Sequence, residues 1–133
     1  MTNPDDILNV LSDLLTRTKA KGADASDAVH IDSNSLAVAQ RLGNPEKLER
    51  SESIDVGLRV LIGKGQAIVS SSDVSSKALE ELADRAVAMA KSVPEDPYCG
   101  LADPEQLVTK LVDIDSFDPD EPTVETLIDW ANR

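Results

Sequence analysis

Aromatic residues are almost absent from this chain of 133 residues, which has one Phe, one Tyr and one Trp. The hydrophobic fraction of 41% therefore comes almost wholly from Ala, Val, Leu and Ile. Such aliphatic side chains pack well where helices lie on a β-sheet. The composition favours an aliphatic core between helices and sheet, and the length suits one domain with a substantial core.

Cysteine and histidine are equally scarce. Cys99 is the single cysteine, which excludes an intramolecular disulfide and a multi-cysteine metal site, and favours a reducing compartment. His30 is the single histidine. An H-E-x-x-H zinc site needs two histidines one helical turn apart, so the chain cannot form one.

Long apolar runs and a basic N-terminal region are also missing. No segment approaches the ~20 apolar residues of a membrane span, and the chain begins Met1-Thr2-Asn3-Pro4-Asp5-Asp6 without the features of a secretory signal. We therefore expect a cytoplasmic protein that does not bind membranes.

Acidic charge is abundant and unevenly distributed. The net charge is −12, and residues 94–133 contain eleven acidic and two basic residues. This balance repels phosphate backbones, so no direct nucleic-acid binding is expected. The acidic stretch is interpreted as a solvated segment. A DNA-mimicking or partner-docking surface remains the alternative.

Two helices are predicted from apolar residues at helical spacing. The first extends from Pro4 to about Lys21, with Asn3 as its N-cap and Gly22 as a left-handed stop. The second covers about Ser75 to Ser92 and has a stripe of Leu, Val and Ala side chains.

Strands are predicted between these helices from alternation of apolar and polar residues. The expected strands are Ala28–Asp32, Leu36–Leu42, Lys47–Ser53, and a hairpin over residues 54–72. In the hairpin, Val56, Leu58, Val60 and Ile62 share one face, and Gly63 to Gly65 form a three-residue bulge-type loop.

These elements predict an α+β fold, with a curved, mostly antiparallel sheet of four to five strands and two helices packed on one face. Residues 1–93 form the helix-sheet-helix domain. Residues 94–133 form an acidic, proline-containing connector with a short extended piece at Leu111–Ile114 and a last helix from Thr123. This helix has no C-terminal cap, so we expect it to be the start of a truncated helix leading to an absent C-terminal domain.

Several residue groups were considered as chemical sites. His30 with one of Ser70, Ser71 or Ser72 and Asp73 has the residue types of a triad, but no G-x-S-x-G turn is present, and a strand end followed by a helix cap explains the serines. We therefore predict no catalytic residue in this chain.

Phosphate and cation sites are not indicated either. Gly57, Gly63 and Gly65 lie between strands and not between a strand and a helix, which indicates a hairpin turn and not a phosphate loop. The pairs Asp113/Asp115 and Asp118/Asp120 lack the spacing of a calcium loop and are interpreted as solvated charges. We predict no cofactor-binding or metal residue.

Three stretches carry a family resemblance. They are Gly22-Ala23-Asp24, the run from Gly57-Leu58-Arg59-Val60 to Ser71-Ser72-Asp73-Val74-Ser75, and the alanine-rich helix Ala83 to Ala90. In this order and spacing the chain resembles the N-terminal region of the TldD/TldE (PmbA) peptidase family, once called modulators of DNA gyrase. Residues 96–103 and 112–119 look like the TldE/PmbA branch.

The resemblance implies the N-terminal domain of a longer chain. In that family TldD and TldE form a heterodimer around a proteolytic chamber, and TldD binds zinc through an HExxxH motif and a cysteine that TldE lacks. None of these positions falls within residues 1–133. The resemblance thus implies a TldD-like partner that holds the zinc, peptide substrates, and a structural and assembly role for this chain.

An alternative from the charge pattern is an independent acidic interaction module, for instance an inhibitor or modulator that occupies the basic groove of a nucleic-acid enzyme.

Overall fold

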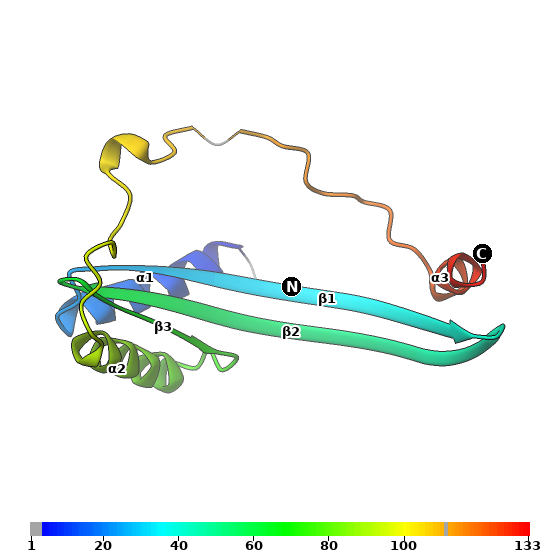
Figure 1. Ribbon diagram of the computed structural model, residues 1–133, viewed down its shortest axis with the longest axis horizontal. Helices are drawn as coiled ribbons and strands as arrows, with labels where there is room; N and C mark the ends of the chain where they lie inside the picture. The colour runs from blue at the N-terminus through cyan, green and yellow to red at the C-terminus, as the bar shows by residue number, and fades with distance from the viewer. Residues whose placement is uncertain (1–3, 111) are drawn as a thin grey trace. The chain divides into compact units, whose positions relative to one another are not determined.

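The computed structural model describes residues 4–110 and 112–133 (Figure 1). The elements follow one another as α1 (Pro4–Ala20), β1 (Ala25–Arg41), β2 (Asn44–Ile62), β3 (Gly65–Ser71), α2 (Ser76–Ser92), a 3-10 turn (Pro104–Gln106) and α3 (Val124–Ala131). The strands form one sheet in the order β1-β2-β3. The predicted α+β class is therefore confirmed.

The sheet has three strands and not the predicted four or five. β1 spans the two expected strands Ala28–Asp32 and Leu36–Leu42, apart from Leu42 itself. β2 joins the expected strand Lys47–Ser53 to the first strand of the expected hairpin. The polar run Ser33-Asn34-Ser35 suggested an interruption, but it contains neither Gly nor Pro and stays extended. The chain reverses instead at Leu42 and Gly43, both of which have positive φ angles.

Contacts divide the chain into two compact units, which are described separately. The first contains Met1–Asp32 and Ser53–Ala102, and the second contains Ser33–Glu52 and Asp103–Arg133. The distal half of the β1-β2 hairpin thus groups with the C-terminal segment, whereas the sequence pattern suggested a boundary between residues 93 and 94.

In the first unit, β2 and β3 pair in the antiparallel direction from Ile62↔Gly65 to Val56↔Ser71. The turn therefore contains two residues, Gly63 and Lys64, and not the predicted three. Gly63 has a φ of +56°, as two-residue hairpin turns require. Gly65 belongs to β3, where its missing side chain leaves room for the carbonyl oxygen of Ala90.

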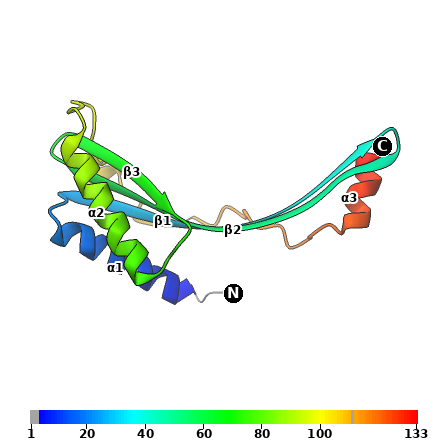
Figure 2. The same ribbon diagram turned by 90° about the horizontal axis from the view of Figure 1, so that it is seen from below.

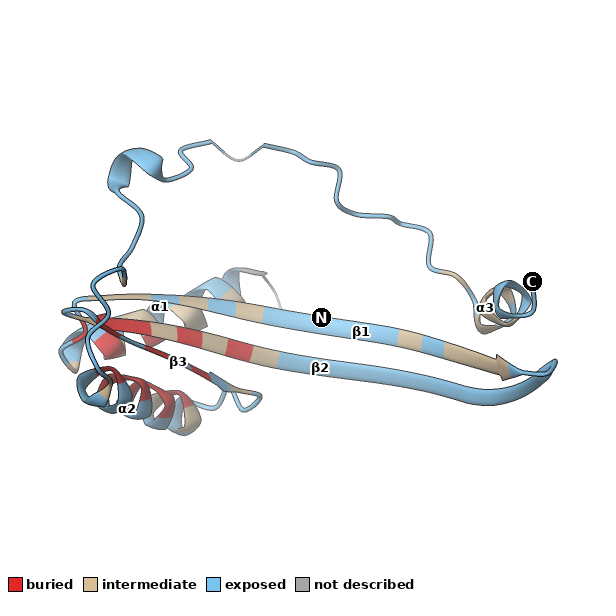
Figure 3. Cartoon of the chain, viewed as in Figure 1, coloured by how far each residue is buried: buried red, intermediate tan, exposed pale blue. Residues whose placement is uncertain are grey.

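Helices α1 and α2 lie on the same side of the sheet (Figure 2). The buried positions in this unit come from α1, α2, β3 and the adjoining part of β2, as Figure 3 shows. The core contains the predicted helix residues Leu79, Leu82 and Val87 together with Val56, Leu58, Val60 and Val69. Ala83, Ala86 and Ala90 of α2 belong to the core cluster and complete this aliphatic interface, while Ala78 is half-buried.

The helix ends follow the predicted signals. Gly22 has a φ of +99° and ends the turn after α1. The side chain of Ser75 caps α2 by accepting a hydrogen bond from the N–H of Ala78 at 3.3 Å. The predicted cap of α1, Asn3, lies outside the described residues.

Ion pairs join α1 to α2 on the exposed side of their contact. Arg17 bonds to Asp13 of its own helix and to Glu80 of α2 at 3.0 Å. Lys21 lies 2.5 Å from Glu80 and 2.6 Å from Asp84. This network could not be predicted from the sequence, since it depends on which faces the two helices turn toward each other.

In the second unit, α3 lies beside the tip of the β1-β2 hairpin in both ribbon views (Figures 1 and 2). Thr123 caps this helix, and Leu127 and Ile128 are half-buried. Trp130 remains 54% exposed. No strand is assigned at residues 112–114, and Leu111, the first residue of the predicted extended piece, lies outside the described residues.

Candidate functional site

The face of the sheet that the helices do not cover is the strongest candidate for a functional surface in the first unit. Val56, Leu58 and Val60 of β2 and the odd-numbered residues of β3 point into the core. The alternate positions therefore point the other way. On β1, the hydroxyl of Ser26 meets Thr18 of α1 at 2.9 Å, which assigns the even positions to the helix side and the odd positions to the open face.

Apolar side chains occupy this open face without cover from a helix. Val29 and Ile31 of β1 are each 51% exposed, and Ile68 of β3 is 65% exposed. Gly57 separates them on β2, and a Cβ added there would lie 3.0 Å from Cγ1 of Val29. The glycine thus lets Val29 lie across the central strand, which explains a residue that would otherwise weaken β2.

An ion pair borders the apolar residues. Arg59 of β2 bonds to the Asp27 carboxylate of β1, with Nε 3.1 Å from Oδ1. The hydrogen bond to Asp27 is the main cause that raises the pKa of Arg59 above its ordinary value. The pair fixes the register of two strands and presents a polar edge beside the apolar residues, an arrangement typical of protein-protein contact surfaces.

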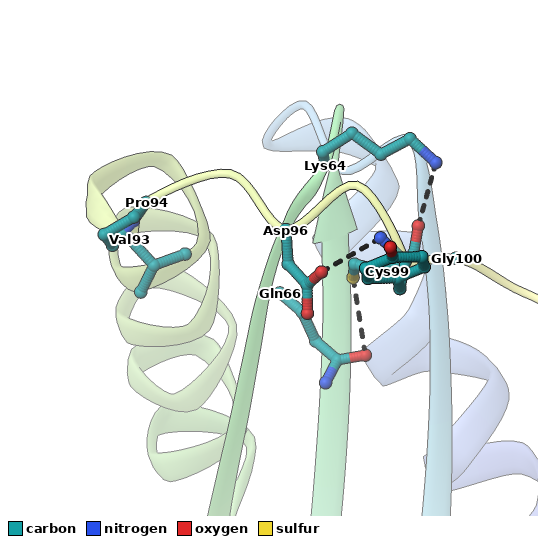
Figure 4. Close-up of a pocket in the computed structure, with 8 residues that line it drawn as sticks. Lys64, Gln66, Val93, Pro94, Asp96, Cys99 and Gly100 are labelled. Carbon is teal, nitrogen blue, oxygen red and sulfur yellow. Dashed lines mark hydrogen bonds between the residues drawn. The ribbon is translucent and has the colours of Figure 1, made fainter.

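A small pocket of about 370 Å³ lies at the β2-β3 turn (Figure 4). The N–H of Asp96 donates to the carbonyl oxygen of Lys64 at 3.0 Å, and the Lys64 ammonium donates to the carbonyl oxygen of Cys99 at 3.0 Å. The Cys99 thiol lies 3.8 Å from Oε1 of Gln66. The pocket lining contains no histidine that could activate this thiol as a nucleophile.

The residues considered for a triad are not brought together. Ser71 bonds to the backbone of Asp73, and the Asp73 carboxylate accepts the N–H of Ser75 at 2.8 Å. Hydrogen bonds from Ser75 lower the pKa of Asp73 below its ordinary value of 3.8. No hydrogen bond within the described part of the chain joins His30 to these residues, so they form a strand end and a helix cap as predicted.

The main-chain N–H at the hairpin turn already has a partner. The N–H of Gly63 donates to the Asp24 carboxylate at 2.7 Å, so an acidic side chain already occupies the place an anion would need. Gly57 and Gly65 are required by close neighbours, as described above.

The acidic pairs bond to their own backbone. The carboxylate of Asp113 accepts the N–H of Asp115 at 3.1 Å, and that of Asp118 accepts the N–H of Asp120 at 2.9 Å. Across residues 4–110 and 112–133, no three His, Cys, Asp or Glu side chains are grouped to hold a metal ion. The donor set of these residues therefore does not fit a zinc site.

The open face and the pocket were not predicted from the sequence. Alternation in β2 identified the two faces, but Asp27 lay outside the predicted strand Ala28–Asp32, so its pair with Arg59 was not predicted. Only the pairing of β1 with β2 brings them together. No helix among the described residues is long and apolar enough to cross a bilayer.

Comparison with known proteins gives a consistent result. The family model for PmbA/TldA metallopeptidase domain 1 matches residues 26–90, which contain the sheet of the first unit and most of α2. The chain is similar to metalloprotease PmbA of Escherichia coli O157:H7, with 27% identity over 111 residues, which cover 84% of this chain and 25% of the relative.

It is also similar to a metalloprotease PmbA homolog of Haemophilus influenzae, with 33% identity over 100 residues, which cover 75% of this chain and 22% of the relative. A crystal structure of a proposed modulator of DNA gyrase from Bacteroides thetaiotaomicron has the same fold, with a TM-score of 0.74 and 14% identity, over 85% of this chain and 25% of that one. The chain thus spans about a quarter of the length of these relatives.

Proposed function

Because this chain belongs to the PmbA/TldA metallopeptidase family through its first domain, we propose that it is the N-terminal, non-metal-binding domain of a TldE/PmbA-like subunit. In this role the domain contributes to subunit assembly and to the walls of the peptidase chamber. Zinc belongs to a TldD-like partner subunit, and the assembly degrades or matures peptides.

The open face of the sheet is the observation that carries this proposal. Helices protect one face, while the other presents Val29, Ile31 and Ile68 to solvent beside the ion pair of Arg59 and Asp27. Grouped apolar residues with a polar border indicate a surface that a protein covers. A purely catalytic domain would not need such a surface, but a domain that holds subunits together does.

The donor chemistry supports the assignment of zinc to another subunit. The chain has one histidine and one cysteine, and they lie apart: His30 belongs to β1, and Cys99 lines the pocket at the β2-β3 turn. A catalytic zinc site takes three protein ligands around one ion. This scarcity of donors supports the proposal that the metal-binding and bond-breaking groups come from elsewhere in the assembly.

The test is to co-purify the chain with a TldD-like subunit and to measure complex formation by sedimentation velocity. Val29→Asp places a charge in the middle of the open face and should abolish the complex, because an unpaired carboxylate would be buried at the contact. Leu8→Asp is the matched control, since Leu8 is 63% exposed on α1 and lies away from the open face. Equal complex formation by both variants would refute this face as the assembly surface.

A further inference from the structure

The outer edge of β3 carries main-chain groups that the fold leaves unused. Among the strands of residues 4–110 and 112–133, β3 pairs with β2 alone, so one side of its backbone has no neighbouring strand. In an antiparallel pair, residues alternate between those that bond to the partner strand and those whose N–H and C=O point away from it. The residues of β3 that point outward are therefore every second one.

Two hydrogen bonds identify them. The carbonyl oxygen of Leu61, which is paired with Gln66, accepts the N–H of Asp24 at 3.0 Å and so does not point at β3. The carbonyl oxygen of Ser70 accepts a hydrogen bond from the Arg85 guanidinium of α2 at 3.2 Å, from outside the strand pair. Gln66, Ile68 and Ser70 occupy alternate positions of β3, so the main-chain N–H and C=O groups of all three point away from β2.

Most of these outward groups have no partner. Within the described residues, no hydrogen bond reaches the main-chain N–H or C=O of Gln66 or Ile68 from the side away from β2. Arg85 donates to the carbonyl oxygen of Ser70 alone. The side chains of Gln66, Ile68 and Ser70 are exposed. Main-chain groups that repeat every second residue, about 6.8 Å apart, match only another extended chain.

We propose that this edge binds an extended, uncharged peptide segment by strand addition, so that the peptide becomes a fourth strand beside Gln66, Ile68 and Ser70. The choice of a peptide as ligand rests on the proposed function. Main-chain hydrogen bonds supply the affinity, and the neighbouring side chains supply the preference. Ile68 favours an apolar β-branched residue next to it, and Gln66 and Ser70 contribute no charge.

The pocket at the turn extends the same site. Gln66 belongs both to the edge and to the lining of the pocket, which also contains Lys64, Asp96 and Tyr98. A peptide lying along β3 therefore passes from the edge into this polar pocket. Chamber walls that hold peptides in the extended form would deliver them to a peptidase site in the conformation that proteases bind.

The first experiment uses the chain described here and a fluorescein-labelled peptide of alternating threonine and valine. Two backbone N-methylated isomers of the peptide are compared, one methylated at each threonine and the other at each valine. Only one set of N–H groups can face β3, so one isomer should bind about tenfold or more weakly than the parent while the other binds nearly as well. Equal affinity of the two isomers would overturn the proposal.

The second experiment changes the edge itself. Ile68→Pro removes an outward N–H that β2 does not use, so the variant should melt close to the wild type but bind the peptide about tenfold more weakly. Ile68→Thr keeps the main chain and should retain binding. If Ile68→Pro does not fold, the N-methylated isomers still decide the question.

Amide NMR shifts locate the contact. Peptide addition should move the N–H signals of Gln66, Ile68 and Ser70, and shifts confined to other residues would overturn the proposal. Shifts of the same amides that depend on protein concentration without peptide would assign the edge to a second copy and also overturn it. If the unmodified chain binds the peptide but forms no complex with the TldD-like subunit, the proposed function alone is refuted.

Discussion

The contact of α2 with the sheet can be tested by the substitution Leu82→Ala. Leu82 is 1% exposed and belongs to the core cluster with residues of β2 and β3. Leu→Ala in a buried site costs about 2–5 kcal/mol, because the transfer free energy of the lost methyl groups adds to that of the cavity left behind.

The free energy lost through Leu82→Ala is large relative to the total free energy of unfolding. The free energy of unfolding of an ordinary domain is about 5–15 kcal/mol, so a cost of about 3 kcal/mol removes a substantial share of it. The melting temperature should fall by about 10 °C for a chain of this size.

Urea unfolding followed by circular dichroism measures the effect. Leu8→Ala is the control, because Leu8 is 63% exposed on α1 and its truncation should change the unfolding free energy by about 0.5 kcal/mol or less. A loss below about 0.5 kcal/mol for Leu82→Ala would mean that α2 does not pack on the sheet, and the architecture described above would be wrong.

Two further predictions concern the turn and the helix contact. Gly65→Ala should lower the unfolding free energy by about 1–3 kcal/mol, because the added Cβ meets the carbonyl oxygen of Ala90, whereas Gly100→Ala, which has nothing within 4 Å of the added Cβ, should be nearly neutral in the same urea titration. Equal effects would show that the contact is not tight. The hydrogen bond from Lys21 is the main cause that lowers the pKa of Glu80 below its ordinary value of 4.5. The folded state thus binds this proton less readily than the unfolded state, so the contribution of Glu80 is present above about pH 4.5 and is lost as the pH falls through the folded pKa. The urea midpoint should therefore fall less between about pH 5 and pH 3 for Glu80→Gln than for the wild type, and an unchanged pH dependence would contradict this role.

The local patterns were sufficient to predict the helices and the central hairpin. The stripe of α2 and the alternation in β2 identified Leu79, Leu82, Val56 and Leu58 as core residues, because each period fixes which side chains share a face. Gly22 identified the end of α1 for a similar local reason. These signals depend only on neighbours in the sequence.

The number of strands could not be predicted in the same way. Ser33-Asn34-Ser35 has the composition of a turn, yet β1 continues through it because the pairing with β2 keeps the backbone extended. The loop predicted at Gly63 was one residue longer than the observed turn, for a related reason. Gly65 was assigned to the loop from its residue type, but the tertiary contact with Ala90 is what requires a glycine there.

The sequence by itself determined the α+β class, the parity of β2 and the family, since these follow from periodicity and from the order of short motifs. Only the tertiary structure decided what the domain leaves exposed. The open face around Val29 and the outward edge at Ile68 exist because β1, β2 and β3 are arranged in one order and the two helices cover one side. Residues far apart in the sequence meet there, and no local pattern encodes which side chains or main-chain groups remain without a neighbour.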